Sequence, residues 1–194
     1  MPLNIPNLLT WFRILLIPLV VAVFYLPENW LPQQEKNLAA TVMFAVAALT
    51  DWLDGYLARI LNQTSAFGAF LDPVADKLMV AAALTVLVQL GRVDALVAFV
   101  IIGREITISA LREWMAKIGK SKSVAVSLIG KIKTTSQMVA ILLLLYQAPI
   151  LGMVDSLKIG TLLIYIAAVL TVWSMFYYMR LALPHAWGEG GAAP

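Results

Sequence analysis

The sequence predicts an all-α polytopic membrane protein, a bundle of six transmembrane helices. Of its 194 residues, 61% are hydrophobic and 13% are charged, and the mean hydropathy is +0.86, which is unlike a soluble domain. Several nearly uncharged stretches approach the ~20 residues with which a helix crosses a hydrocarbon core of about 30 Å. We therefore expect one transmembrane domain over residues 1–183 and a flexible C-terminal tail over residues 184–194.

The first three expected helices are apolar runs bounded by polar segments. They cover residues 8–26, 37–61 and 73–90. Asn7 or Thr10 could cap the first helix, and a polar loop over residues 62–71 joins the second helix to the third. Asp72 followed by Pro73 has the pattern of an N-cap residue with proline at the first helical position, so the third helix is expected to begin there.

The last three expected helices are separated by turns and by a basic link. They cover residues 93–115, 131–146 and 157–179. Gly91 and Arg92 form the turn before the fourth helix, and a lysine-rich link over residues 117–122 follows it. Residues 148–155 form the turn before the sixth helix. Six crossings place both termini on the same side of the membrane.

The basic residues are distributed unequally between the two sides of this bundle. Of the 14, Lys36, Arg92 and Lys158 lie on one side, and the other eleven lie on the side of the termini and of the loop over residues 62–71. Lysine and arginine concentrate on the cytoplasmic side of membrane proteins. Both termini and this loop are therefore expected to face the cytoplasm.

Four aspartates lie within residues 51–76 of this apolar chain: Asp51, Asp54, Asp72 and Asp76. A charged side chain at the centre of a membrane helix costs roughly 2.5–3.5 kcal/mol on insertion scales, so their presence needs a functional reason. The first two are three residues apart and the last two are four apart, so each pair shares one helical face. The short loop between the helices brings the two faces together, and the four carboxylates can share one site.

Such a site requires a cation, because four unpaired carboxylates would repel one another. Oxygen ligands at this density suit Mg²⁺ or Mn²⁺, whereas zinc prefers histidine and cysteine, and the chain has one histidine and no cysteine. Mg²⁺ usually keeps substrate phosphates among its ligands, so the cluster predicts a phosphorylated ligand. Gly55 and Ala58 lie on the face of the first two aspartates and leave room for it. Arg59, one turn further on, can hold a phosphate with two hydrogen bonds.

These residues together have the spacing D-x2-D-G-x2-A-R-x8-G-x3-D-x3-D, the signature of the CDP-alcohol phosphotransferase family, which the chain resembles. The signature positions are Asp51, Asp54, Gly55, Ala58, Arg59, Gly68, Asp72 and Asp76. Longer stretches are similar to bacterial members that use glycerol 3-phosphate, namely NIPNLLTWFR, GAFLDPVADK, REITISALREWMA and GKIKTTSQMVA. The resemblance extends from Asn4 to the sixth helix.

The resemblance implies a six-helix bundle of the family's type and a role for each motif residue. Two ions of Mg²⁺ or Mn²⁺ would be bound by Asp51, Asp54, Asp72 and Asp76. The last of these would also act as the general base. The CDP part of CDP-diacylglycerol would contact Gly55, Arg59 and Ser65.

The implied reaction transfers the phosphatidyl group of CDP-diacylglycerol to sn-glycerol 3-phosphate and releases CMP, a step of phospholipid biosynthesis. The resemblance further implies a homodimer in the bacterial cytoplasmic (inner) membrane, with its active site on the cytoplasmic side. A direct displacement fits the residues, because no cysteine or histidine stands ready to form a covalent intermediate. An aspartate nucleophile remains open.

The acceptor carries a phosphate of its own, so a second basic site is expected within reach of Asp76. The candidates, in order of preference, are Arg112, Lys131, Arg104 and Lys133. The two arginines are eight residues apart and lie roughly on one helical face. The alternative for Lys131 and Lys133 is a topogenic or lipid-headgroup role, which is the interpretation we favour for the lysines of residues 117–122. Arg104 lies deeper and is more costly to leave without a role.

Two alternatives to the leading function stay open. Another acceptor alcohol, such as inositol phosphate, serine or phosphatidylglycerol, would use the same motif. A cation transporter would also explain clustered acids, but it leaves Gly55, Ala58 and Arg59 without a role and requires acids at the midplane rather than at one membrane face. The sequence has no nucleic-acid motif and predicts no nucleic-acid partner.

Overall fold

A computed structural model of the protein describes residues 5–60, 66–120, 128–150 and 155–186. Within these ranges the chain forms six α-helices, one short 3₁₀-helix and no β-strand, which confirms the all-α prediction. The elements are α1 (Ile5–Ala22), η1 (Val23–Tyr25), α2 (Gln33–Ile60), α3 (Ala66–Gln89), α4 (Ala95–Lys117), α5 (Leu128–Tyr146) and α6 (Ser156–Ala186). Two of the described stretches are long and apolar enough to cross a membrane, Asn7–Tyr25 and Ser156–Pro184. Membrane association follows from them.

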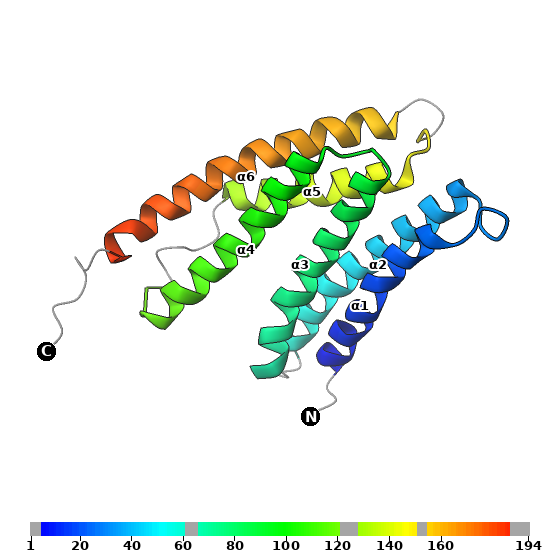
Figure 1. The fold of residues 1–194 in the computed structure, drawn as a ribbon. Coiled ribbons are helices and arrows are strands. Elements are labelled where there is room, and N and C mark those ends of the chain that lie inside the picture. The colour runs from blue at the N-terminus through cyan, green and yellow to red at the C-terminus, as the bar shows by residue number, and fades with distance from the viewer. Residues whose placement is uncertain (1–4, 61–65, 121–127, 151–154, 187–194) are drawn as a thin grey trace, which may run out of the picture.

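Consecutive helices run in opposite directions, so the connections alternate between the two ends of the bundle (Figure 1). Helix α1 packs against both α2 and α3, and α6 packs against α5 and α4. Contacts of α3 with α4 and of α2 with α5 join these two groups. The start of α1 and the end of α6 lie at the same end of the bundle, which is also where α2 ends and α3 begins. The aspartate motif lies at this end of α2 and α3, close to the first turns of α1.

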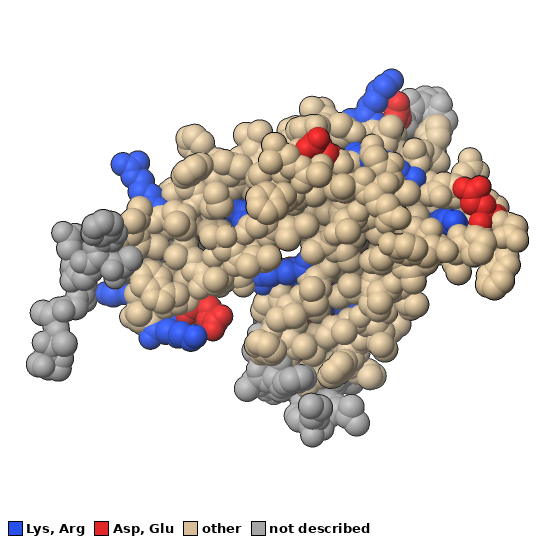
Figure 2. Space-filling view, viewed as in Figure 1, with Lys and Arg blue, Asp and Glu red and all other residues tan. Residues whose placement is uncertain are grey.

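The core and the outer surface of the bundle are both apolar. Large side chains that are fully buried between the helices include Phe44, Leu84, Leu87, Ile101 and Ile141. Many other large apolar side chains are exposed, and most of the face shown in Figure 2 carries no charge. Apolar surface of this extent suits lipid rather than water.

The largest difference from the sequence prediction is the start of α3. This helix begins at Ala66, so residues 66–71 are helical and the prediction of a loop up to residue 71 is wrong. Asp72 and Pro73 therefore lie inside the helix, and the prediction that Asp72 is its N-cap is also wrong. A proline inside a helix removes one backbone hydrogen bond, which membrane helices tolerate where neighbouring groups satisfy the freed carbonyl.

Two helix starts near the ends of the bundle also differ from expectation. Helix α1 begins at Ile5, so Asn7 and Thr10 lie inside it and neither is its cap. Asp94 caps α4, because its carboxylate accepts a hydrogen bond from the backbone N–H of Leu96 at 2.8 Å.

Asp155 directly precedes α6, as Asp94 precedes α4, and binds the first backbone N–H groups of the helix. Its carboxylate accepts hydrogen bonds from the backbone N–H groups of Lys158 at 3.2 Å and Leu157 at 3.1 Å. The backbone hydrogen bond from Lys158 is the main reason why the pKa of Asp155 lies below its usual value. Helix α6 continues to Ala186, beyond the predicted start of the tail at residue 184, and residues 187–194 lie outside the described ranges.

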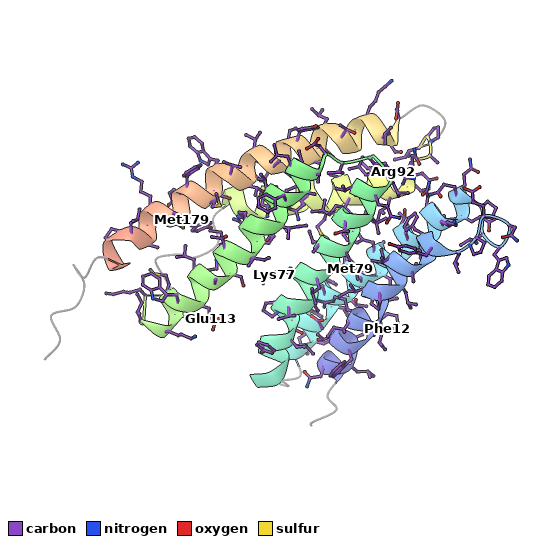
Figure 3. The ribbon with its side chains drawn as sticks, in the orientation of Figure 1. Phe12, Lys77, Met79, Arg92, Glu113 and Met179 are labelled. Carbon is purple, nitrogen blue, oxygen red and sulfur yellow. The ribbon has the colours of Figure 1, made fainter. Side chains whose placement is uncertain are left out.

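A polar cluster ties three segments together at the end of the bundle opposite the aspartates. Arg92 lies in the turn after α3 (Figure 3). Its Nη1 donates to the carbonyl oxygens of Leu144 at 3.0 Å and Leu145 at 3.1 Å. Its Nη2 donates to Asn37 Oδ1 at 2.9 Å, and Asn37 Nδ2 donates to Gln147 Oε1 at 3.3 Å. The guanidinium thus satisfies carbonyls at the C-terminal end of α5, where a positive charge is favourable.

We expect Arg92→Met to destabilise the bundle without changing its chemistry. The substitution leaves two helix-end carbonyls without their charged donor, which costs roughly 2–3 kcal/mol and lowers the thermal unfolding midpoint by about 4–12 °C. Lys158→Met is the matched control, because Lys158 is exposed and forms a surface ion pair with Asp155 at 3.3 Å. Equal unfolding midpoints for the two variants in detergent would contradict this role of Arg92.

Candidate active site

An arginine of α1 bridges the first two aspartates of the motif. Arg13 Nη1 donates to Asp51 Oδ1 at 2.5 Å, and Arg13 Nη2 donates to Asp54 Oδ2. Asp51 and Asp54 therefore turn toward one point, as expected for positions three apart on one face of α2. The Arg13 side chain is only 1% exposed and that of Asp54 4%, whereas Asp51 is 45% exposed and lies at the edge of the site. A buried charge pair of this kind is held by charge-assisted hydrogen bonds.

A second contact joins α1 to the third aspartate. The hydroxyl of Thr10, which is buried, donates to Asp72 Oδ1 at 2.6 Å. Thr10 and Arg13 are three residues apart, so the same face of α1 contacts α2 through Arg13 and α3 through Thr10. Asp51, Asp54 and Asp72 are thereby brought to one side of α1, which supports the expectation that they share a site.

The donor set at this point suits a cation with oxygen ligands. Asp51 and Asp54 already hold the positive guanidinium group of Arg13 between them. Among the described residues, no three histidine, cysteine or acidic side chains lie close enough together to form a complete metal site. The two carboxylates of α2 fit a hard divalent ion because both are oxygen ligands and both turn toward one point. A complete coordination shell requires additional oxygen ligands beyond these two.

The fourth aspartate opens into a cavity of about 400 Å³ between α3, α4 and α5. The side chain of Asp76 is exposed there. The cavity is lined by Pro73, Asp76, Lys77, Val80, Arg104, Glu105, Ile108, Ser109, Arg112, Gly130, Thr134, Gln137 and Met138. Both arginines that were predicted to bind the acceptor phosphate thus share a cavity with the predicted general base. Figure 2 shows basic groups in the hollow between the ends of α3 and α4.

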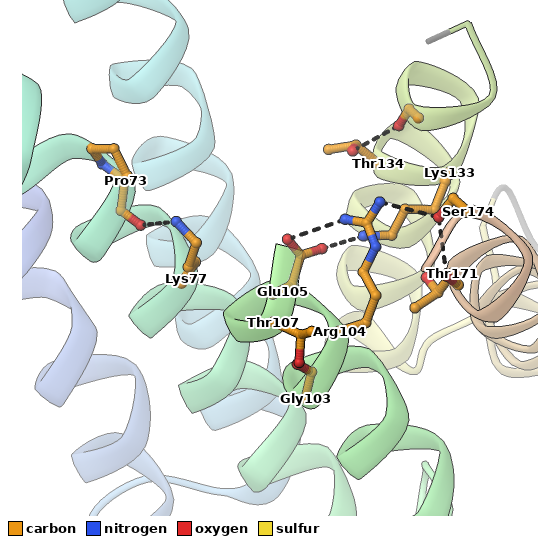
Figure 4. A network of polar contacts seen from close by, with 11 residues as sticks. Pro73, Lys77, Gly103, Arg104, Glu105, Thr107, Lys133, Thr134, Thr171 and Ser174 are labelled. Atoms are coloured by element: carbon orange, nitrogen blue, oxygen red, sulfur yellow. Dashed lines mark hydrogen bonds and ion pairs between the residues drawn. The ribbon is translucent and has the colours of Figure 1, made fainter. Parts of the chain in front are cut away.

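An ion-pair and hydrogen-bond network connects two cavity residues of α4, Arg104 and Glu105, to α5 and α6 behind them (Figure 4). Glu105 accepts a hydrogen bond from Lys133 Nζ and lies 3.7 Å from Arg104 Nη1. Arg104 Nη2 donates to Ser174 Oγ at 3.0 Å, and Ser174 Oγ donates to the carbonyl oxygen of Thr171 at 3.0 Å. The network fixes Arg104 from two sides. Lys133 is 1% exposed and does not line the cavity, so its charge acts on the cavity through Glu105.

The two cavity arginines retain hydrogen-bonding capacity. Within the described part of the chain, the Nε atoms of Arg104 and Arg112 are buried and have no hydrogen-bond partner. The guanidinium carbon of Arg112 lies 5.3 Å from the centre of the Tyr178 ring, a cation–π contact that orients the group. Buried donors without a partner carry a free-energy cost that a bound anion would remove.

Several predicted site residues are only partly described or not described at all. Gly55 and Arg59 lie in the last turns of α2 and Lys131 lies in the first turn of α5, and their side chains are outside the description. Ser65 lies outside the described residues. Their predicted contacts stay predictions.

Sequence reasoning missed three residues that the fold brings to the site. Thr10 was considered primarily as a helix cap and Arg13 was given no role in the site, although their i, i+3 spacing on one face could have linked them to the acids. Gln137 lies one helical turn after Lys133 and lines the cavity while being 2% exposed. Gln137 ends a polar run of residues 133–137 inside an expected membrane helix, and such a run is the signal that could have drawn attention to it.

Aspartates of α2 and α3 beside a cavity lined by two arginines suit a membrane phosphotransferase, and comparison with known proteins assigns the chain to that class. The model of the CDP-alcohol phosphatidyltransferase family matches residues 3–173, so the chain belongs to this family. Enzymes of the family generally use a divalent metal ion.

The chain is also similar to individual bacterial enzymes of the family. It is 53% identical over 184 residues to proteins of Shigella flexneri serotype 5b, Shigella boydii serotype 4 and Escherichia coli (strain K12). Each match covers 94% of this chain and 96% of the relative. All three relatives are named CDP-diacylglycerol–glycerol-3-phosphate 3-phosphatidyltransferase.

Proposed function

We propose that the protein transfers the phosphatidyl group of CDP-diacylglycerol to sn-glycerol 3-phosphate, forming phosphatidylglycerophosphate and CMP. The family match and the names of the relatives support this reaction. The structural observation that carries it is the shared cavity, in which Asp76 faces the same space as Arg104 and Arg112. A carboxylate for a hydroxyl proton and two guanidinium groups for a phosphate are what this acceptor requires.

The proton transfer falls to Asp76 in this proposal. Its carboxylate takes the proton of the acceptor hydroxyl as the hydroxyl oxygen attacks the lipid-side phosphorus of the pyrophosphate. The bond between that phosphorus and the bridging oxygen breaks in line, and the electron pair leaves with CMP. Arg104, held by Ser174 and Glu105, and Arg112, held against Tyr178, position the acceptor phosphate.

A divalent ion, Mg²⁺ or Mn²⁺, would be held by Asp51, Asp54 and Asp72, with Asp76 completing the set. When bound it neutralises the pyrophosphate and stabilises the departing CMP, as metal ions do in phosphoryl transfer, and two ions are expected. Thr10 and Arg13 orient the carboxylates through their hydrogen bonds. Carboxylates held by such outer contacts keep the geometry that a metal requires.

The donor lipid has a place beside the acceptor cavity. A hollow of about 670 Å³ between α3 and α4 shares Pro73, Lys77 and Ser109 with the acceptor cavity. Its remaining lining is mainly apolar: Phe70, Val74, Leu78, Ile106, Ala110 and Glu113. An acyl chain fits this lining. We assign the CDP headgroup to Gly55, Arg59 and Ser65.

In the proposed membrane arrangement, all six α-helices cross the bacterial cytoplasmic (inner) membrane. Both termini and the aspartates face the cytoplasm, where soluble glycerol phosphate is available. The excess of basic residues at that end supports this orientation. The resemblance to the family supports a homodimer as the active form.

A substrate panel tests the reaction. Purified protein is supplied with CDP-diacylglycerol, Mg²⁺ and one alcohol at a time, and CMP release is measured. We expect release with glycerol 3-phosphate and little with serine, inositol phosphate or phosphatidylglycerol. Release with one of the other alcohols but not with glycerol 3-phosphate would overturn the acceptor assignment. Metal-dependent ion flux in proteoliposomes without CMP release would instead favour a transporter.

Arg112→Ala is expected to weaken acceptor binding more than turnover. Loss of a charged phosphate ligand should raise the KM for glycerol 3-phosphate about 10- to 100-fold, with a smaller change in kcat. Lys117→Ala is the matched control, because Lys117 is exposed and pairs with Glu113 at 3.0 Å. A KM for Arg112→Ala equal to that of the control would place the acceptor phosphate elsewhere.

A further inference from the structure

The reaction proposed above gives no task to several polar groups of the acceptor cavity, and one of them has a buried oxygen without a hydrogen-bond partner among the described residues. Gln137, on α5, lines the cavity and is 2% exposed. Within the described part of the chain its Oε1 is buried without a hydrogen-bond partner. A buried carbonyl oxygen that has lost its water and gained no partner is unfavourable, so such an atom marks a place where a donor is expected to bind.

The other polar groups of the cavity near α5 are already engaged. Thr134, three residues before Gln137, donates its hydroxyl to the carbonyl oxygen of Gly130 at 2.9 Å. Glu105 accepts from Lys133 and lies 3.7 Å from Arg104. Among the described cavity residues, Gln137 offers the acceptor oxygen that is buried and unpaired, and it has no charge that would repel a phosphate.

Glycerol 3-phosphate brings three polar groups into such a cavity. In the proposed reaction its phosphate binds Arg104 and Arg112, and its attacking hydroxyl contacts Asp76. Its second hydroxyl remains and needs a hydrogen-bond acceptor. Because α3, α4 and α5 each supply one wall, a small molecule held by the arginines of α4 and by Asp76 of α3 faces Gln137 of α5.

We propose that Gln137 is a specificity-determining residue that accepts a hydrogen bond from the non-reacting hydroxyl of the acceptor alcohol. The inference rests on the proposed function and defines the acceptor more narrowly, as a phosphate ester with two hydroxyls. A site built to bind a hydroxyl rejects an analogue that lacks it, because the buried partner then stays unpaired.

The probe is 3-hydroxypropyl phosphate, which keeps the phosphate and the attacking hydroxyl of glycerol 3-phosphate and lacks the second hydroxyl. CMP release is measured with both acceptors, and the ratio of their kcat/KM values is compared between proteins. We expect the wild type to prefer glycerol 3-phosphate by about 100-fold or more. Gln137→Met, close in size but without a strong acceptor, should reduce this preference to less than about tenfold, mainly by slowing the reaction of glycerol 3-phosphate. A ratio within one protein cancels any general loss of active enzyme.

Thr85→Val is the matched control, because its exposed hydroxyl donates to the carbonyl oxygen of Ala81 at 2.8 Å and does not line the acceptor cavity, and it should keep the wild-type ratio. Equal use of both acceptors by the wild type would overturn the inference even if Gln137→Met fails to fold. An unchanged ratio in Gln137→Met would do the same. Neither outcome contradicts the proposed function. The proposed function is contradicted by a different result, the absence of CMP release by the wild type with glycerol 3-phosphate.

Discussion

Asp76→Asn should lower kcat by about 100- to 10,000-fold while CDP-diacylglycerol still binds. The substitution keeps the size and polarity of the side chain but removes the group that accepts the hydroxyl proton. The carboxylates of Asp51, Asp54 and Asp72 keep their contacts with Arg13 and Thr10, so the proposed donor and metal site is largely preserved. Turnover is measured as CMP release, and donor binding is measured by titration with CDP-diacylglycerol in the presence of Mg²⁺.

Asp94→Asn is the matched control for this experiment. Asp94 caps α4 at its far end, and asparagine is an equally good cap, so turnover should stay close to that of the wild type. Near wild-type turnover in Asp76→Asn would end the assignment of Asp76 as general base. A loss of donor binding equal to the loss of turnover would instead make Asp76 primarily a metal or donor ligand.

Local spacing explains why the relative positions of the candidate site residues within one helix could be predicted from the sequence. Helical periodicity alone places Asp51 beside Asp54, and the convergence of these two carboxylates on Arg13 agrees with it. The eight-residue spacing of Arg104 and Arg112 likewise put both on one face, and both line the same cavity. Both predictions concern the relative positions of residues within a single helix, and helical periodicity alone is enough to give them.

Spacing within one helix could not predict the contacts between helices. Arg13 reaches α2 and Thr10 reaches α3 only because α1 packs between them, and spacing within α1 does not specify its neighbours. Lys133 looked like a phosphate ligand because it is basic and near the right helix end, yet Glu105 of α4 holds it. The start of α3 was missed because a strong local signal, Asp72 followed by Pro73, was outweighed by the apolar residues before it.

The Arg13 bridge is also the basis of the second large expected effect. Asp54→Asn should abolish turnover, because a proposed metal ligand is lost, and should also destabilise the protein. Asp54 and Arg13 are both almost fully buried, and removing one partner of a buried pair leaves the other charge without its full compensation. Such losses amount to about 3–5 kcal/mol, and the remaining contact of Arg13 with Asp51 places the expected value toward the lower limit.

A double variant separates the two consequences. In Arg13→Met/Asp54→Asn both charges of the buried pair are removed. No uncompensated buried charge is then left, and such a charge is the main cost of losing one partner. We therefore expect the thermal unfolding midpoint to recover relative to Asp54→Asn, whereas CMP release stays absent. Recovery of the midpoint without activity would show that the pair stabilises the bundle while the carboxylate itself serves the reaction. Turnover in Asp54→Asn would contradict the metal-ligand assignment, and an unrecovered midpoint in the double variant would contradict the role given to the pair.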